Sequence, residues 1–239
     1  LSSRGVASDS MPAPSAITLT SPKEPFSSES KPSRSIAVNI SERDMDRIVA
    51  VTDAILAEHG DDYLALAAAS GFLHSMIFTA SAVYQVMVVG LNPLQLVLVG
   101  SVLEVTAFLG EVPTGVVADV FSRRLSILIG YAVIGCGFLL EGSVPQFTAI
   151  LLAQVLWGLG YTFTSGATEA WLVDEIGQEQ AGPLFLREAQ ISAVAILLGI
   201  GAGTLLGQQG GLQLPILLGG AGLLALALAL AFIMPEHHF

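Results

Sequence analysis

The feature that most constrains the fold is the near absence of basic side chains after the first sixty or so residues. Beyond Arg47, Lys and Arg occur only as Arg123, Arg124 and Arg187, and long runs of Leu, Val, Ala, Ile and Gly fill the intervals. About a quarter of the residues of a soluble domain are charged, whereas only 12% of this 239-residue chain are charged. This pattern indicates that residues 63–239 are solvated by lipid.

The apolar runs have the length of membrane-spanning helices. A bilayer core is crossed by about 20 apolar residues in a helix, and six segments meet or approach that length. They are residues 63–89, 94–118, 125–141, 147–172, 189–207 and 212–234. The intervening stretches carry turn residues, as in GLNP, EGSVPQ and EIGQEQAGP. Period-two alternation is missing, which disfavours a barrel. The sequence therefore predicts an all-α, polytopic membrane domain of six transmembrane helices at residues 61–239.

The N-terminal region has a different composition. Residues 1–40 are rich in Ser, Pro and Ala, too polar to offset the entropy of ordering, and are predicted to be a disordered tail. In residues 41–60 apolar side chains recur at helical spacing and Gly60 is a plausible stop, which predicts a short amphipathic helix or a linker. The chain begins with Leu, so a fragment and a true start at Met11 or Met45 both stay open.

The basic residues predict the orientation in the membrane. Arg123 and Arg124 follow the second predicted span and Arg187 follows the fourth, while the loops after spans one, three and five contain no Lys or Arg. Basic loops stay in the cytoplasm. We therefore expect a multi-pass protein of the plasma membrane with both termini in the cytoplasm. In the fifth span, Gly199, Gly203 and Gly207 share one helix face and predict close helix packing.

A short charged stretch between spans two and three carries a family resemblance. It reads Gly115-V-V-A-Asp119-V-F-S-Arg123-Arg124, which resembles the G-x-x-x-D-R-x-G-R-R/K loop of the major facilitator superfamily. Val replaces the usual arginine and Ser the usual glycine. The preceding EVPTG and the later SGATEAWLVDE look like a drug-efflux branch of that family. The resemblance covers about residues 63–239 and implies one six-helix half of a two-half transporter.

In that family two halves rock about a central site, and the loop acts as a cytoplasmic latch. The resemblance implies that Asp119 is the latch acceptor, that Arg123 or Arg124 is its donor, and that Gly115 leaves room beside the aspartate. Bidentate pairing would offset the cost of a carboxylate at the membrane edge. Further acidic and basic residues on the predicted cytoplasmic side are candidate partners. These are Glu169, Asp174 and Arg187.

Glu104 lies near the middle of the second span, where an ionised side chain is costly. Two interpretations stay open. It binds a proton or a cation in a cavity, or it is a protonated carboxyl hydrogen-bonded to a neighbouring helix. The candidates for lining a proton or substrate cavity are Glu104, Glu111, His74, Tyr84, Gln85 and Tyr161, with Trp171 beside them. His74 could instead bond a helix neighbour, and Tyr84 and Trp171 could be interface aromatics.

Several function classes are disfavoured. The chain has no basic patch for a phosphate backbone, so nucleic-acid binding is not expected. It lacks G-x-S-x-G and a phosphate-binding glycine loop followed by Lys, so no enzyme activity is expected. The lone Cys136 and the adjacent His237 and His238 give no metal-site spacing, and no cofactor is expected.

The sequence therefore predicts a secondary transporter, with proton-coupled efflux of a small organic compound. Because the transport path of the resembled family lies between two halves, a second six-helix half or a homodimer is an expected partner, besides the bilayer and the substrate. The alternative is a non-transporting membrane scaffold or partner-binding protein, for which six helices suffice.

Overall fold

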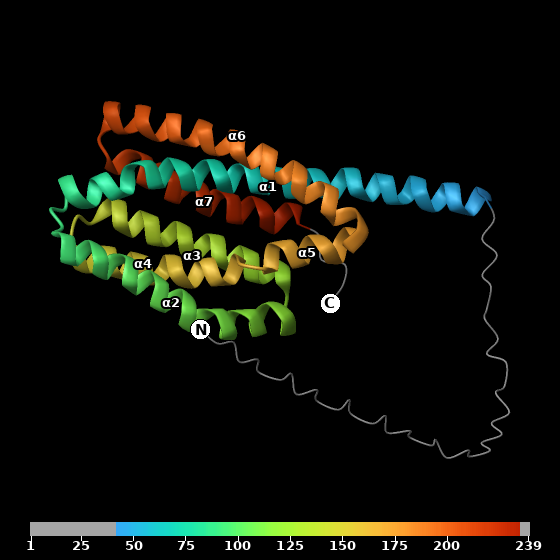
Figure 1. Cartoon of the computed structure of the whole chain (residues 1–239), viewed down its shortest axis with the longest axis horizontal. Coiled ribbons are helices and arrows are strands. Elements are labelled where there is room, and N and C mark those ends of the chain that lie inside the picture. Colours follow the sequence, from blue (N-terminus) through green and yellow to red (C-terminus); the bar gives the residue numbers. More distant parts are fainter. Residues whose placement is uncertain (1–41, 235–239) are drawn as a thin grey trace, which may run out of the picture. The chain divides into compact units, whose positions relative to one another are not determined.

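A computed structural model of the chain describes the backbone of residues 42–234 and, except at 42, 44–59, 175–176 and 179–180, their side chains. The tail predicted at residues 1–40 lies outside the described residues. All regular structure in the described part is helical (Figure 1). The helices are α1 (Glu42–Met87), α2 (Pro93–Val120), α3 (Arg123–Ser143), α4 (Phe147–Thr164), α5 (Ala167–Ile176), α6 (Gln178–Gly210) and α7 (Gln213–Ile233).

Six stretches of these helices are long and apolar enough to cross a membrane. They are Gly60–Met87, Pro93–Val120, Arg123–Ser143, Phe147–Asp174, Ala181–Gly210 and Gln213–Ile233. The predicted all-α fold with six spans is confirmed, and the chain is a multi-pass membrane protein.

The first helix corrects one detail of the sequence prediction. Gly60 was expected to stop a short helix, but α1 continues through it to Met87. Gly60 is buried, and a Cβ added there would lie 3.4 Å from the side chain of Leu184 on α6. Gly60 therefore lies inside the helix, packed against α6, and does not end it.

The fourth and fifth spans also differ from the sequence prediction. The predicted span 147–172 is divided into α4 and α5 at Gly166, whose φ is +74°. A second glycine, Gly177 with φ +84°, separates α5 from α6. The helix of the fifth span, α6, therefore begins at Gln178 and not at residue 189 as predicted. Positive φ favours glycine, which explains both breaks. Apolar content marks where a helix enters the membrane, but helices extend beyond that point into polar sequence.

The third span is longer than predicted. Residues 141–146 were expected to form a turn, but α3 extends to Ser143 and includes Glu141.

The turn that leads into α2 has a well-defined helix cap. Asn92 accepts a hydrogen bond from the backbone of Gln95 at 3.0 Å, and the Gln95 side chain accepts one from the backbone of Asn92 at 2.9 Å. This capping box fixes the start of α2.

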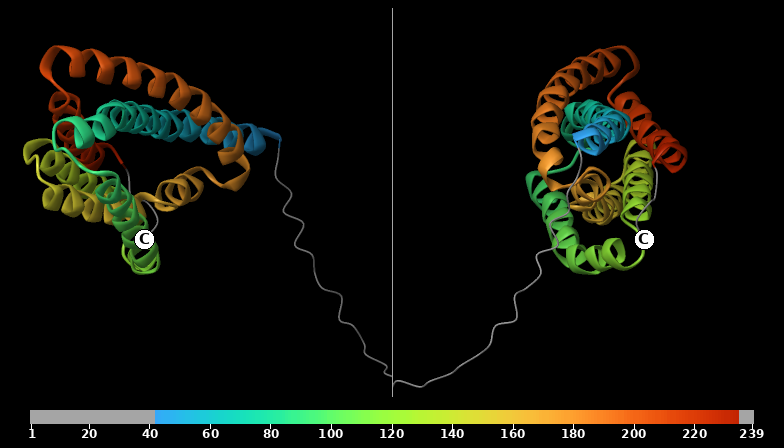
Figure 2. Two further views of the ribbon diagram at one scale, coloured as in Figure 1. Left: turned by 60° about the vertical axis from the view of Figure 1, so that its left-hand side comes forward. Right: turned by 90° about the vertical axis from the view of Figure 1, so that its right-hand side faces the viewer.

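The spans pack in a symmetric pattern of neighbours. α1 packs against α6 and α7, α4 packs against α2 and α3, and α3 packs against α7. Exchanging α1, α2 and α3 for α4, α6 and α7 maps the first two pairs onto the next two and maps the pair of α3 and α7 onto itself, as expected for two structural repeats of three spans. α2 and α6 are equivalent edge helices, and both lie on the left of the right-hand view in Figure 2.

Glycines allow the closest helix crossings. A Cβ on Gly160 of α4 would lie 2.7 Å from the carbonyl oxygen of Gly130 on α3. On α6, a Cβ on Gly203 would lie 2.6 Å from the carbonyl oxygen of Met76 on α1, and Gly199 meets the backbone of α1 one turn away. Gly207, the third glycine of the predicted row, faces only a side chain of Leu212, at 3.6 Å. Two of the three glycines in the row thus bring α6 against the backbone of α1.

Candidate functional site

A cavity of about 290 Å³ lies between α2 and α4. Glu104 and Glu111 of α2 line it two helical turns apart, and Tyr161 of α4 lines the facing wall. The α2 residues on the wall follow one another at spacings of three, one and three, so that they share one helix face. The remaining lining residues are Ala107, Phe108, Thr162 and Ser165. Thr114, one turn beyond Glu111, donates a hydrogen bond to the carbonyl oxygen of Thr162 at 3.1 Å and ties α2 to α4.

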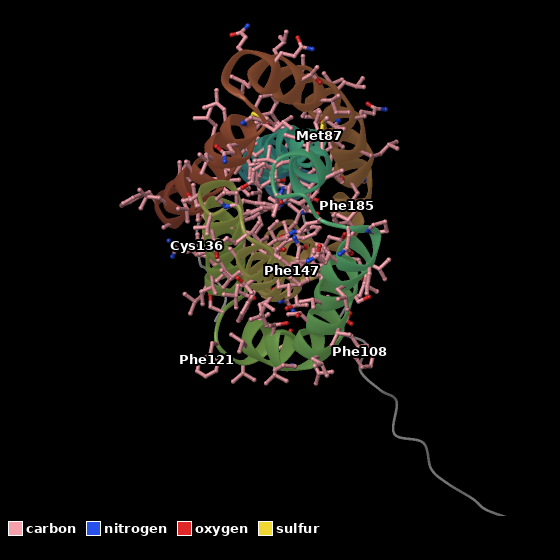
Figure 3. The ribbon with its side chains drawn as sticks, turned by 90° about the vertical axis from the view of Figure 1, so that its left-hand side faces the viewer. Met87, Phe108, Phe121, Cys136, Phe147 and Phe185 are labelled. Carbon is pink, nitrogen blue, oxygen red and sulfur yellow. The ribbon has the colours of Figure 1, made fainter. Side chains whose placement is uncertain are left out.

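A second cavity of about 460 Å³ adjoins the first, since Tyr161 and Ser165 line both. Its wall is formed by α1, α3, α4, α5 and α6 and carries the carboxylates of Glu169 and Glu188. The two cavities together contain four glutamates, and none of their described lining residues is Lys, Arg or His. The combined surface is therefore strongly acidic. In Figure 3 Phe108, which lines the smaller cavity, lies at the outer edge of the bundle, so that cavity opens toward the surface.

The charges of the loop between α2 and α3 contact other helices. Arg123 forms a close ion pair with Asp174 of α5 and donates a hydrogen bond to the carbonyl oxygen of Ala170 at 2.9 Å. Asp119 lies 4.0 Å from the same guanidinium, and its side chain is 74% exposed. Arg124 donates a hydrogen bond to the carbonyl oxygen of Ala231 at the end of α7. The two arginines thus join the start of α3 to α5 and to α7.

The other residues of the predicted latch are placed apart from these contacts. Gly115 is exposed, and a Cβ there would meet nothing within 4 Å. Glu169 lines the larger cavity, and Arg187 is exposed on α6. Of the partners proposed for the arginines, Asp174 is the one that the structure brings to Arg123.

His74 belongs to an aromatic cluster between α1, α3 and α4. Its Nδ1 lies 2.8 Å from the carbonyl oxygen of Ser70, and its ring centroid lies 5.8 Å from that of Phe78 and 6.4 Å from that of Phe138. Phe78 continues the cluster to Trp157 at 5.0 Å. Ser70, one helical turn before His74, lines the larger cavity, whereas His74 and the other rings of the cluster lie outside its lining.

Tyr84 and Gln85 lie away from both cavities. They are buried and contact Glu141 near the end of α3, a residue at which the sequence prediction ended the third span and which it did not name as a site residue. A usable signal was present, because Ile134, Phe138 and Glu141 follow at spacings of four and three and so share one helix face. Trp171 is 4% exposed on α5 and lies outside the lining of both cavities.

Comparison with known proteins places the chain in a family. The family model described as Major Facilitator Superfamily matches residues 13–186. The chain is also similar to a protein of Bacillus subtilis (strain 168) named "Uncharacterized MFS-type transporter YxaM", with 27% identity over 106 residues. A second similar protein is "D-xylose-proton symporter-like 3, chloroplastic" of Arabidopsis thaliana, with 26% identity over 113 residues.

These similarities cover only parts of the proteins. The matched stretches make up 44% and 47% of this chain, but 27% of the Bacillus protein and 20% of the Arabidopsis protein. The chain thus matches well under two thirds of the length of either relative.

Proposed function

The chain belongs to the major facilitator superfamily, and we propose that it forms the N-terminal six-helix half of a secondary transporter. The proposed activity is efflux of a small, positively charged organic compound in exchange for protons. The observation that carries the proposal is the acidic cavity of α2 and α4, in which Glu104 and Glu111 face Tyr161. The drug-efflux branch suggested by EVPTG is part of the same proposal.

The chemistry of exchange follows from the charge of the cavity. An ionised glutamate at membrane depth is costly unless a cation accompanies it, so Glu104 is stable with a bound proton or beside a cationic substrate. One carboxylate cannot hold both at once. Binding of the cation therefore expels the proton, and rebinding of the proton expels the cation. This competition couples two opposite movements, and Tyr161 adds an aromatic face that attracts a cation.

A second wall is needed to enclose the substrate. The edge helices α2 and α6 are the least buried spans, with 11% and 17% of their apolar windows inside the bundle. Large apolar side chains stand out from them, such as Phe108 at 77% and Leu197 at 69% exposure. We propose that a second six-helix half, or a second copy of this chain, faces the cavities between these edges.

The contacts of Arg123 and Arg124 support the latch. They join the α3 start to α5 and α7 at the end of the bundle that we assign to the cytoplasm, and rocking of the two halves would break or remake them. The distribution of arginines supports an orientation with both termini in the cytoplasm, and the plasma membrane is part of the same proposal. A scaffold function needs no acidic cavity, which is why we favour transport.

The experiment measures binding and proton release together. The purified chain in detergent is titrated calorimetrically with tetraphenylphosphonium, an organic cation, in two buffers of different protonation enthalpy. We expect the wild-type chain to release protons on binding. The double variant E104Q/E111Q keeps the size of both side chains and removes their charge. It should bind about tenfold more weakly or worse, since the attraction between opposite charges about 4 Å apart is worth about 1–4 kcal/mol, and release no proton.

The matched control is Asp61→Asn, which removes one exposed acidic charge on α1 outside the lining of both cavities. It should bind like the wild type. Equal affinity and equal proton release in E104Q/E111Q and the wild type would exclude the cavity as the site of exchange. In proteoliposomes that contain a second half, or enough copies of the chain to pair, a tetraphenylphosphonium gradient should then drive proton movement in the wild type and not in the double variant.

A further inference from the structure

A second carboxyl group is buried at the other end of the bundle. Glu141, in the last turn of α3, is fully buried. Its Oε1 accepts hydrogen bonds from Ser81 Oγ at 2.5 Å and from Gln85 Nε2 at 3.0 Å, and its backbone carbonyl accepts one from the Tyr84 hydroxyl at 3.0 Å. The three donors occupy one face of α1 because they lie at spacings of three and one. Glu141 is thus the point at which α3 is bonded to α1.

The other carboxyl oxygen, Oε2, is buried and has no hydrogen-bond partner. Among the described side chains of the helices packed against it, none brings a positive charge to this oxygen. Tyr84 is the titratable group that α1 places beside Glu141, and His74 lies a further two to three turns away along that helix. In α4 the titratable side chain is Tyr161, at the far end, and α7 contains none between Gln213 and Ile233. α2 reaches α3 with its Asp119 end.

The arginines at the start of α3 lie far from the carboxyl group of Glu141. Arg123 and Glu141 are separated by almost the whole of α3, which corresponds to about 27 Å at 1.5 Å per residue. Two hydrogen bonds from neutral donors to one oxygen do not offset the removal of an ionised carboxylate from water when the second oxygen remains unbonded. The group avoids that cost by binding a proton.

We propose that Glu141, with Ser81 and Gln85, forms a buried proton-binding site that holds α1 against α3 when occupied and loosens this end of the bundle when empty. The ligand is one proton, bound at Oε2. On release the O–H bond breaks, its electron pair stays on the carboxylate, and the proton passes to water. Water lies near Glu141, because Ser143, two residues further along the chain, is exposed. The site is separate from Glu104, and its occupancy does not depend on what the cavity of α2 and α4 binds.

Infrared spectroscopy of the purified chain in lipid tests the occupancy. We expect the C=O stretching band of a protonated carboxylic acid at neutral pH in the wild type, and Glu141→Gln should remove the component of that band that Glu104→Gln leaves in place. The band should persist in Glu104→Gln, which controls for the other membrane carboxyl. Glutamine has the shape of the protonated acid and keeps an oxygen for Ser81 and Gln85, so this variant is expected to fold.

The pH dependence of stability tests the consequence. A proton held in the folded state and lost from the unfolded chain stabilises at low pH, and this stabilisation declines as pH rises. The unfolding equilibrium of the wild type relative to E141Q should therefore shift toward unfolding by up to about tenfold per pH unit. Identical protonated-carboxyl bands together with parallel pH curves in the two proteins would overturn the proposal.

A second variant covers a failure of E141Q to fold. Ser81→Ala removes one donor to Oε1 and leaves the acid in place, so the same C=O band should move to higher frequency. A band that is absent from the wild type, or unmoved by S81A, would equally reject a protonated Glu141.

Discussion

The crossing of α6 and α1 gives a sharp test of the packing. In Gly203→Ala the new Cβ would lie 2.6 Å from the carbonyl oxygen of Met76 and 3.2 Å from its Cα. Ordinary contacts begin at 3.4 Å, so the closest approach is short by 0.8 Å. The obstacle is backbone, which cannot rotate away, and Gly199 restricts the adjacent turn of α6 in the same way. We expect a loss of about 1–3 kcal/mol of unfolding free energy, the usual range for overpacking.

Gly201 provides a matched control on the same helix. It lies two residues from Gly203, points to another side, and would meet nothing within 4 Å with a Cβ. Gly201→Ala therefore makes the same chemical change without the clash. Because alanine favours a helix over glycine by up to about 1 kcal/mol, this variant should be as stable as the wild type or slightly more stable.

The assay is unfolding of the purified chain by increasing mole fraction of sodium dodecyl sulfate in mixed micelles, followed by helical circular dichroism and by fluorescence of the two tryptophans. Only G203A should unfold at a lower mole fraction. The packing argument is refuted if G203A is as stable as the wild type, or if G201A loses as much as G203A.

Two further predictions concern helix ends. Asn92→Ala removes the capping box that begins α2 and should cost about 1 kcal/mol in the same unfolding titration, whereas Asn92→Asp keeps an acceptor for the backbone of Gln95; equal losses in both variants would contradict the capping role. Asp174→Asn should destabilise more than Asp119→Asn, within the range of about 0.2–1 kcal/mol for partly exposed ion pairs, because Asp174 is the closer partner of Arg123. The difference should shrink in high salt, and a difference unaffected by salt would rule out the charge as its cause.

Much of the fold could be predicted because lipid imposes a simple rule on the sequence. Apolar runs of sufficient length located all six spans, and the second span, predicted to begin at residue 94, begins at Pro93. The length of an apolar run does not predict backbone dihedral angles. The sequence prediction therefore missed the division of the fourth span at Gly166 and the start of α6 at Gln178. Those features depend on positive φ and on helix that continues outside the lipid.

The candidate site was predictable where one helix decides the geometry. Glu104 and Glu111 lie seven residues apart, so that one helix face carries both and the two reach the cavity together. Tyr84 and Gln85 depend on how α1 is rotated toward α3, and an all-round apolar helix gives little sign of its rotation. Their contact with Glu141 therefore emerged only from the structure. The transport roles of all these residues remain predictions.

The position of Cys136 has a practical consequence. It is the single cysteine of the chain, and it lies exposed on α3 at the outer edge of the bundle (Figure 3). This chain thus offers one thiol for a spin label or fluorophore on a membrane-spanning helix, with no other cysteine of the chain to be removed first. One added cysteine at the far end of α1 or α6 would complete a pair of probes, and the distance between them would report how the bundle deforms.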